Sequence, residues 1–173
     1  MPTSYQAPMR KDQTDTRTRS QSSETNTKSE LATVGHILKG KGRDVFAIRP
    51  QETLKNAVDA LKDKGIGALM VTDANGALCG ILSERDIVRK LADTPGQTLP
   101  QLVGDVMTQN VETCTPEEPL VSVLKRMTAG RFRHMPVVSD TGLLGMVTIG
   151  DVINFRLTEL EHEALQLKQL IVG

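Results

Sequence analysis

Two stretches of the chain follow one pattern: GILSERD at residues 80–86 and GMVTIGD at residues 145–151. In both copies the hydroxyl residue and the aspartate stand three positions apart: Ser83 with Asp86, and Thr148 with Asp151. This spacing is typical of a capping box at a helix start, although Glu or Gln is more usual than Asp at its second position. A short carboxylate beside a hydroxyl can equally bind the ribose and phosphate of a nucleotide. The pattern alone leaves both interpretations open.

The similarity between the two halves of the chain extends far beyond these phrases and amounts to an internal repeat. The matched segments are 34–38 with 103–107, 44–65 with 110–131, and 68–88 with 134–153. A unit of about sixty residues buries only about 60% of its unfolded-chain surface and is marginal alone. We therefore expect the two copies to pack their sheets together as one stable unit.

The first half of each copy is predicted to be a short strand followed by a helix. The strands are expected at residues 45–48 and 111–114. Apolar residues then recur at i, i+3, i+4 and i+7 from Leu54 and from Leu120, which is typical of an amphipathic helix. Gly65 and Gly130 lie where these helices are expected to stop.

The second half of each copy is predicted to be two apolar strands and another helix. Turn sequences join the strands, DANG at residues 73–76 and DTG at residues 140–142. The second strand ends in the repeated phrase, and the next helix is expected to begin at Asp86 or Asp151. The sequence thus predicts a mixed α/β (α+β) fold with two β-α-β-β-α repeats.

The ends of the chain differ from the repeats. Residues 1–30 are rich in Ser, Thr, Gln and charges and have almost no apolar residues, which predicts a disordered tail. We assign residues 31–98 and 99–156 to the two repeats and residues 157–173 to a C-terminal helix. The apolar residues of that helix fall on one face. It is expected either to cover its own domain or to pack on a partner subunit.

The composition argues against several classes of partner. The 21 basic and 21 acidic residues balance, so the chain has no general attraction to nucleic acid or anionic lipid. It has no Trp, one Tyr and three Phe, too few aromatic side chains for base stacking. No apolar run approaches the length of a membrane span, and residues 1–30 lack the apolar core of a secretory signal. We expect a cytoplasmic protein with no nucleic-acid or membrane partner.

No catalytic or metal-binding pattern stands out in the sequence. The three histidines, His36, His134 and His162, lack partners at metal-ligand spacing. No phosphate-binding loop, dinucleotide-binding glycine motif or serine-hydrolase motif occurs. Cys114, on a predicted strand, is expected to be a buried apolar thiol rather than a redox sensor. We therefore expect no enzyme activity, no metal and no required cofactor.

Residues 33–156 resemble a CBS-domain pair, also called a Bateman module. The resemblance rests on the internal repeat, the β-α-β-β-α order and both repeated phrases. It implies two repeats packed about a pseudo-twofold axis, with two clefts between them that commonly take AMP, ADP, ATP, S-adenosylmethionine or a dinucleotide such as NAD. Because no enzyme domain accompanies the pair, the chain resembles the stand-alone proteins of this family.

The resemblance also implies a set of binding residues. Ribose and phosphate contacts are expected from the repeated phrases, at Ser83, Asp86, Thr148 and Asp151. Met135 and Pro136 are expected to present backbone atoms to the adenine edge. The glycines that open the phrases, Gly80 and Gly145, either let backbone or ligand approach closely or serve as simple turn residues.

The second copy differs from the first at Arg133 and His134, which replace Gly67 and Ala68. Arg offers a planar fork to phosphate, and a protonated His134 would add charge, so its contribution is expected to be larger near pH 6 than near pH 8. The alternative is that neither residue binds a ligand: Arg133 would be an ordinary solvent-exposed charge, and His134 a loop residue whose hydrogen bonds are made within the protein. Since the first copy lacks the pair, its cleft is expected to bind a less charged ligand, to bind weakly or to stay empty.

These features predict a non-enzymatic regulatory module that binds an adenine nucleotide, most readily AMP, and signals to a regulated protein by conformational change. A homodimer is the expected assembly. The alternative is a purely structural homodimerising scaffold in which the repeated phrases serve only as helix caps. The sequence does not name the regulated protein.

Overall fold

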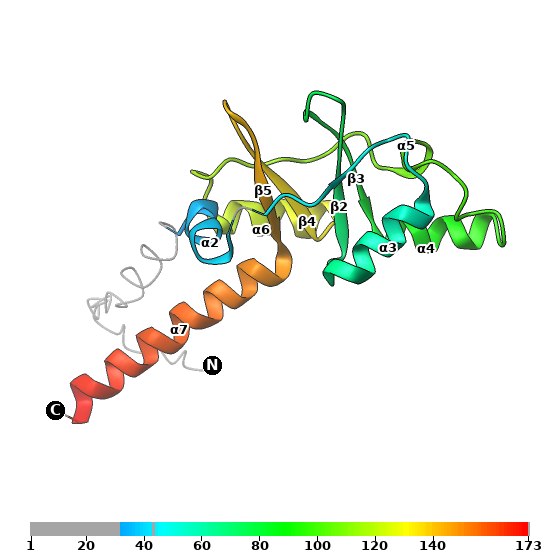
Figure 1. The fold of residues 1–173 in the computed structure, drawn as a ribbon. Helices are drawn as coiled ribbons and strands as arrows, with labels where there is room; N and C mark the ends of the chain where they lie inside the picture. The colour runs from blue at the N-terminus through cyan, green and yellow to red at the C-terminus, as the bar shows by residue number, and fades with distance from the viewer. Residues whose placement is uncertain (1–31, 43, 173) are drawn as a thin grey trace, which may run out of the picture.

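The computed structural model describes residues 32–42 and 44–172, so the disordered tail predicted at residues 1–30 lies outside the described residues. The described chain forms two halves side by side, each with a β-hairpin and helices (Figure 1). The hairpins approach closely at their bases. A Cβ built on Gly67 would lie 3.2 Å from Nε2 of His134. The predicted mixed α/β fold with two repeats is confirmed.

The first half contains the complete predicted unit. Its elements are β1 (Ala47–Ile48), α3 (Leu54–Lys64), β2 (Ala68–Thr72), β3 (Leu78–Ser83) and α4 (Glu84–Asp93). The strand order is β1-β2-β3, with β1 parallel and β3 antiparallel to β2. The central strand β2 is buried along its whole length and packs with α3 in one hydrophobic core.

The second half lacks the strand predicted at residues 111–114. Its elements are α6 (Leu120–Gly130), β4 (His134–Ser139), β5 (Gly142–Thr148) and α7 (Ile149–Val172). Only Cys114 pairs with β4, through one parallel bridge to Val137. In the first half, Met70 N–H donates to the Phe46 carbonyl at 3.0 Å and extends the ladder. The matching residue here is Pro136, which has no N–H to donate, so the ladder stops.

Each half is completed by a short helix from the other half of the sequence. Helix α2 (Val34–Lys41) begins the first repeat, yet Val34, Ile37 and Leu38 are buried in the core of the second half. Conversely, α5 (Val103–Val106) begins the second repeat and places Val103 in the core of the first half. This reciprocal exchange, which the sequence did not predict, joins the two repeats into one unit.

The first helices of the two repeats end in the same conformation but on different residues. After α3, Gly65 adopts the left-handed conformation, with φ 61° and ψ 38°. Helix α6 continues through Gly130, and Arg131 takes that conformation, with φ 55° and ψ 35°. The stop predicted at Gly130 is therefore one residue early. Gly130 is needed because a Cβ there would collide with the ring of Phe132.

The helices after the repeated phrases begin earlier than predicted. Helix α4 begins at Glu84 and α7 at Ile149, so Asp86 and Asp151 are each the third helical residue. A capping box places its acid at this third position. Helix α7 also runs without a break for 24 residues. The C-terminal helix predicted separately at 157–173 is therefore a continuation of the second repeat, and Figure 1 shows it leading away from the body.

The two phrase-opening glycines are explained by protein packing. A Cβ on Gly80 would collide with the Met107 side chain and lie 3.1 Å from the carbonyl oxygen of Thr108. A Cβ on Gly145 would lie 3.3 Å from Leu38. Leu38 lies in the exchanged helix α2, and Met107 and Thr108 directly follow the exchanged helix α5. The structure thus supports the close-approach interpretation with the protein itself as the neighbour.

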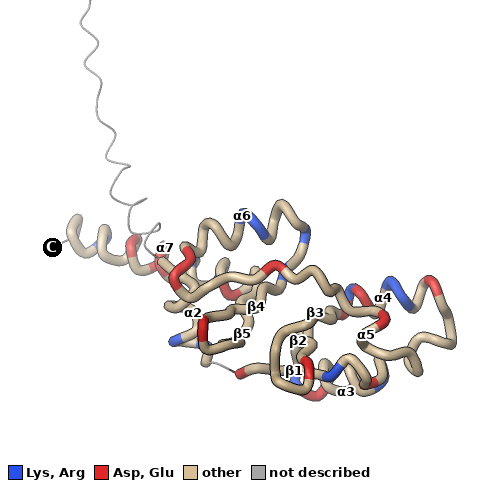
Figure 2. Tube along the Cα trace, turned by 90° about the horizontal axis from the view of Figure 1, so that it is seen from above, with Lys and Arg blue, Asp and Glu red and all other residues tan. Residues whose placement is uncertain are grey.

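The surface of the described chain carries mixed charge. Basic and acidic residues alternate along the helices and loops instead of collecting on one face (Figure 2). Among the described residues, no helix is both long and apolar enough to cross a membrane.

Candidate functional site

The first repeated phrase forms a complete helix cap. Ser83 Oγ accepts a hydrogen bond from the Asp86 backbone N–H at 3.4 Å. In return, Asp86 Oδ2 accepts from the Ser83 backbone N–H at 2.9 Å and from its hydroxyl at 2.6 Å. Within the described ranges, Oδ1 of Asp86 has no hydrogen-bond partner. One carboxylate oxygen therefore caps the helix, and the other remains able to accept from a ligand.

The second phrase forms the same cap but also binds a lysine. The Thr148 N–H donates to Asp151 Oδ2 at 2.8 Å, and the Asp151 N–H donates to Thr148 Oγ1 at 3.1 Å. Lys41 Nζ, in the last turn of α2, donates to the same Oδ2 at 2.7 Å. The carboxylate of Asp151 thus already has a cationic partner, whereas that of Asp86 has none among the residues that the structure describes.

A cleft of about 360 Å³, which we call cleft A, lies beside Thr148. Its apolar walls come from Phe46, Ile66, Met70 and Met146. Its polar side chains are Lys41, Asp44, His134 and Thr148. Asp151 does not line this cleft but reaches it through the Lys41 ion pair. Cleft A is therefore small and largely apolar, and it has few groups with which to bind an anion.

A larger cleft of about 670 Å³, cleft B, lies on the side of the first repeated phrase. It is lined by four arginines, Arg85, Arg89, Arg131 and Arg133. Its three carboxylates are Glu84, Asp86 and Glu112, and the last of these is bound by Arg126 from outside the cleft. Ile81, Val111 and Phe132 supply apolar surface. Both volumes fall in the range of small-ligand sites, but only cleft B is rich in arginine.

The predicted site residues divide between the two clefts. Ser83, Asp86 and Arg133 line cleft B, so Arg133 of the second repeat faces the phrase of the first repeat. Thr148 lines cleft A, and His134 lines both clefts. The basic pair therefore does not act as one unit: its arginine serves one cleft, while its histidine stands between the two.

His134 is less basic than the sequence implied. Burial lowers the pKa of its imidazole, and the nearby positive charge of Lys41 lowers it further. Opposing contributions from Glu84 and Asp151 do not reverse the direction. Because the pKa lies below its usual value, His134 is largely neutral near neutral pH. The expected change in its ligand contribution between pH 6 and pH 8 must therefore shift to more acidic pH.

Met135 and Pro136 lie inside the protein. Both are buried in β4, and neither lines cleft A or cleft B. The carbonyl oxygen of Pro136 already accepts a hydrogen bond from the Cys114 backbone N–H at 3.0 Å. Contact between these two residues and an adenine edge stays a prediction.

Three of the four arginines of cleft B were missed by the sequence analysis. Arg85 lies within the first phrase and Arg89 follows it by four residues on the same helix, and Arg85 Nη1 donates to the Arg131 carbonyl at 2.9 Å. Among the described residues, Arg131 is the one residue other than glycine with a positive φ. A side chain in this conformation costs on the order of 1 kcal/mol relative to glycine. The alignment of Gly65 with Arg131 was the available signal, because an arginine that replaces a conformationally preferred glycine points to a use for its side chain.

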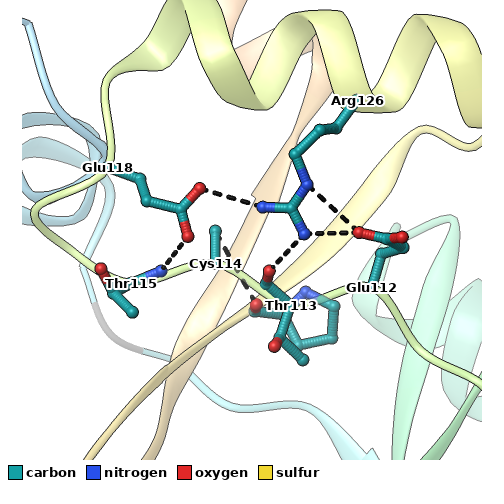
Figure 3. A network of polar contacts seen from close by, with 7 residues as sticks. Glu112, Thr113, Cys114, Thr115, Glu118 and Arg126 are labelled. Carbon is teal, nitrogen blue, oxygen red and sulfur yellow. Dashed lines mark hydrogen bonds and ion pairs between the residues drawn. The ribbon is translucent and has the colours of Figure 1, made fainter.

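A polar network holds the wall of cleft B next to β4. Arg126 on α6 donates to Glu112, to Glu118 and to the Thr113 carbonyl (Figure 3). These contacts fix residues 112–118 where the predicted strand does not form. Cys114 lies inside this segment, and burial raises the pKa of its thiol to about 12. The predicted buried, unreactive thiol is thus supported by its environment.

Comparison with known proteins agrees with this geometry. The family model "CBS domain" matches residues 34–93 and 103–158. The two matched segments begin with the exchanged helices α2 and α5. The chain therefore belongs to the CBS domain family, and the predicted pair of repeats is confirmed.

Relatives of the chain include proteins of different size. It is 34% identical over 152 residues to the CBS domain-containing protein CBSX3, mitochondrial, of Arabidopsis thaliana, covering 83% of this chain and 74% of that protein. It is 32% identical over 110 residues to inosine-5′-monophosphate dehydrogenase of Nitrosopumilus maritimus, but covers only 22% of that enzyme. The chain spans less than two thirds of several such relatives, so their whole-protein activities do not follow from the match.

Solved structures share the fold. The CBS-domain containing protein ATU1752 from Agrobacterium tumefaciens superposes with a TM-score of 0.71 and 39% identity, over 73% of this chain and 94% of that one. The CBS domain pair of protein MJ0100 superposes with a TM-score of 0.66 and 25% identity, over 75% and 98% of the two chains. That pair was solved in complex with 5′-methylthioadenosine and S-adenosyl-L-methionine.

Proposed function

We propose that this protein is a non-enzymatic sensor that binds an adenine nucleotide of the AMP type in cleft B. The observation that carries the proposal is the composition of that cleft. It combines four arginines with a carboxylate, Asp86, whose Oδ1 is free within the described ranges. Arginine recognises phosphate through paired hydrogen bonds, and a free carboxylate oxygen accepts from ribose hydroxyls. The adenosine ligands of the MJ0100 domain pair add support from a relative of the same fold.

The phosphate is assigned to Arg131 and Arg133, and the ribose to Asp86 and the hydroxyl of Ser83. The apolar side chains of cleft B offer a surface for the base. Capping and ligand binding are compatible at Asp86, because the cap uses Oδ2 alone. Asp86 therefore needs no change of conformation to accept from a ribose.

Cleft A fits a less charged ligand. Its lysine is already paired with Asp151, and Asp44 adds a negative charge at its edge. An adenosine derivative without phosphate, such as S-adenosylmethionine, suits this apolar cavity better than AMP does. Because Asp151 does not line cleft A, a ligand there would reach its carboxylate only after the Lys41 ion pair opened.

Signalling follows from the position of the clefts between two repeats. A ligand shifts a conformational equilibrium only by binding one state better than the other. Cleft B is lined from both repeats, so a nucleotide there favours the arrangement in which Arg133 and Asp86 face the same ligand. The regulated protein would read this arrangement in the cytoplasm, where we expect the chain to act.

A homodimer is the proposed working form. The helices after the two repeated phrases carry exposed apolar side chains, and Val88 on α4 and Ile153 on α7 stand at equivalent positions of the two repeats. Exposed apolar surface that forms a contiguous patch marks protein interfaces. The structural scaffold remains the competing function, and the two complete helix caps are the observation that favours it.

A thermal denaturation series separates the sensor from the scaffold. AMP, ATP, S-adenosylmethionine, NAD and GMP are each added at millimolar concentration. A ligand at 100 times its dissociation constant stabilises the folded protein by about 2.7 kcal/mol, which raises the melting temperature by several degrees. We expect a rise with AMP that exceeds the rise with GMP. No rise with any adenosine ligand would instead support the scaffold.

A further inference from the structure

Helix α7 carries an apolar stripe that its own domain leaves uncovered. The stripe consists of Ile153, Leu157, Leu160, Ala164, Leu167 and Ile171. All six side chains are exposed, and Leu157, Leu167 and Ile171 keep 53%, 59% and 83% of their surface. The opposite side of the helix faces the body, where Val152 is buried and Phe155 packs on the same core. The earlier alternative, that this helix covers its own domain, holds only for its first turns.

The spacing of the stripe is that of a coiled coil. Successive members stand 4, 3, 4, 3 and 4 residues apart. These alternating steps place the six residues at the a and d positions of a heptad, the narrow seam that packs against a partner helix in a left-handed supercoil. An ordinary surface helix needs only a broad apolar face at 3.6 residues per turn. Most of the stripe also lies beyond residue 158, where the match to the CBS family ends.

The charges beside the stripe are complementary to a second copy of the same helix. The flanking positions hold Arg156, Glu161, Glu163 and Lys168. In a parallel pair, flanking residues five positions apart meet across the seam, which joins Arg156 to Glu161 and Glu163 to Lys168 of the other copy. Both pairings of the parallel arrangement unite opposite charges, whereas antiparallel helices that overlap along the whole stripe would bring Glu161 to Glu161 and Glu163 to Glu163 of the other copy. The flanking charges therefore favour a parallel pair.

We propose that α7 forms a two-stranded coiled coil with α7 of a second copy of this chain. The proposal deepens the homodimer of the preceding section by naming its surface, and it is independent of nucleotide binding. Two to three heptads are marginal in isolation. Here the helix is already ordered at its N-terminal end by the packing of Val152 and Phe155, so the nucleation cost is met before the copies associate.

The chain supplies a closely matched control for this surface. Leu165 lies two residues from Leu167 and is also exposed, at 55% against 59%, but it stands outside the stripe. The substitutions Leu167→Glu and Leu165→Glu therefore make the same chemical change at nearly equal exposure on one helix. Neither residue belongs to a hydrophobic core, so both variants should fold.

The test is the dissociation constant of the full-length dimer, measured by sedimentation velocity over a concentration series. Each substitution appears twice in a symmetric dimer. Because two buried leucines are lost, Leu167→Glu should weaken the dimer by at least about 100-fold. Leu165→Glu should change it by less than about threefold, as expected for an exposed site.

A charge exchange tests the pairing. Glu163→Lys should weaken the dimer, and adding Lys168→Glu should restore it, because the two positions meet across a parallel seam. A double variant that stays as weak as Glu163→Lys would contradict the parallel coiled coil. A dimer equally stable in both leucine variants would place the interface elsewhere while leaving the homodimer intact. A monomeric wild type would overturn both, and AMP titration of the same samples reports separately on the sensor.

Discussion

Cleft A and cleft B are built from matching parts of two repeats, yet they differ in charge. Each contains a hydroxyl residue of the repeated phrase, and each phrase ends in an aspartate that caps a helix. Beside cleft A, Asp151 is neutralised by Lys41, and the left-handed residue is Gly65. In cleft B, Asp86 has no cationic partner within the described part of the chain, and the left-handed residue is Arg131. The comparison teaches that one fold can retain its caps in both copies while only one copy acquires the chemistry to bind an anion.

Among the variants that separate the two clefts, Arg133→Ala should cause the largest loss of AMP affinity. A hydrogen bond to a charged group contributes about 1.5–3 kcal/mol, so the loss of Arg133 should weaken AMP by about 10- to 150-fold. Adenosine has no phosphate and should lose less than about threefold. Calorimetric titration of both ligands measures the ratio, with Lys62→Ala on the far helix α3 as the control. Equal losses for AMP and adenosine would mean that Arg133 supports the cleft without touching phosphate.

Arg131→Gly restores the residue that the first repeat has at this position. The left-handed conformation favours glycine, so the free energy of unfolding should stay equal or rise by up to about 1 kcal/mol. AMP affinity should nevertheless fall by about tenfold, because a phosphate partner is lost. Denaturant unfolding and calorimetry on the same preparation measure the two quantities. A variant of lower stability with unchanged AMP affinity would contradict a ligand role for Arg131.

The two aspartates can be compared by the same substitution. Asp86→Asn removes the carboxylate from cleft B and should weaken AMP by about tenfold. Asp151→Asn changes only the cleft A side, where it also releases Lys41, and should leave AMP affinity within about twofold. Because Asn also caps helices, each variant should lose less than about 1 kcal/mol of stability. If both variants reduced AMP affinity equally, the assignment of AMP to cleft B would be wrong.

The smallest effect is the pH dependence contributed by His134. Its pKa is lowered in the folded protein, so below about pH 6.5 the unfolded chain binds the proton more readily than the folded one does. The free energy of unfolding should therefore fall as pH drops through that range, while at higher pH His134 contributes no pH dependence. His134→Gln should reduce this fall in thermal melts of the unliganded protein, and His162→Gln on α7 is the control. An unchanged pH profile in His134→Gln would show that the buried imidazole titrates normally.

The sequence predicts those features of the fold that repeat. The two phrases, the amphipathic helices and the turn signals were enough to predict two β-α-β-β-α units and their order. The missing strand at residues 111–114 was predictable in principle, because Pro136 cannot donate to a neighbouring strand. The exchange of α2 and α5 between the cores was not, since the apolar residues of a short helix do not indicate which half of the chain will bury them.

The candidate site was predicted unevenly for a similar reason. Ser83, Asp86 and Arg133 line one cleft. The sequence comparison had instead linked the basic pair to the second repeat and expected the cleft of the first repeat to be the less charged one, because it could not show that Arg133 faces the phrase of the other repeat. Lys41 was missed because its partner Asp151 lies 110 residues away. Arg131 was missed although its alignment with Gly65 was visible in the sequence, because the left-handed conformation that makes this exchange notable is seen only in the backbone angles.

The most direct test of the account is calorimetric titration of the wild-type protein with AMP and with adenosine under identical conditions. If cleft B binds the phosphate through its arginines, AMP should bind at least about tenfold more tightly than adenosine. Added salt should narrow that preference, because part of it is screened charge. Equal affinity for the two ligands, or no binding of AMP at millimolar concentration, would contradict the assignment of cleft B as an anionic nucleotide site.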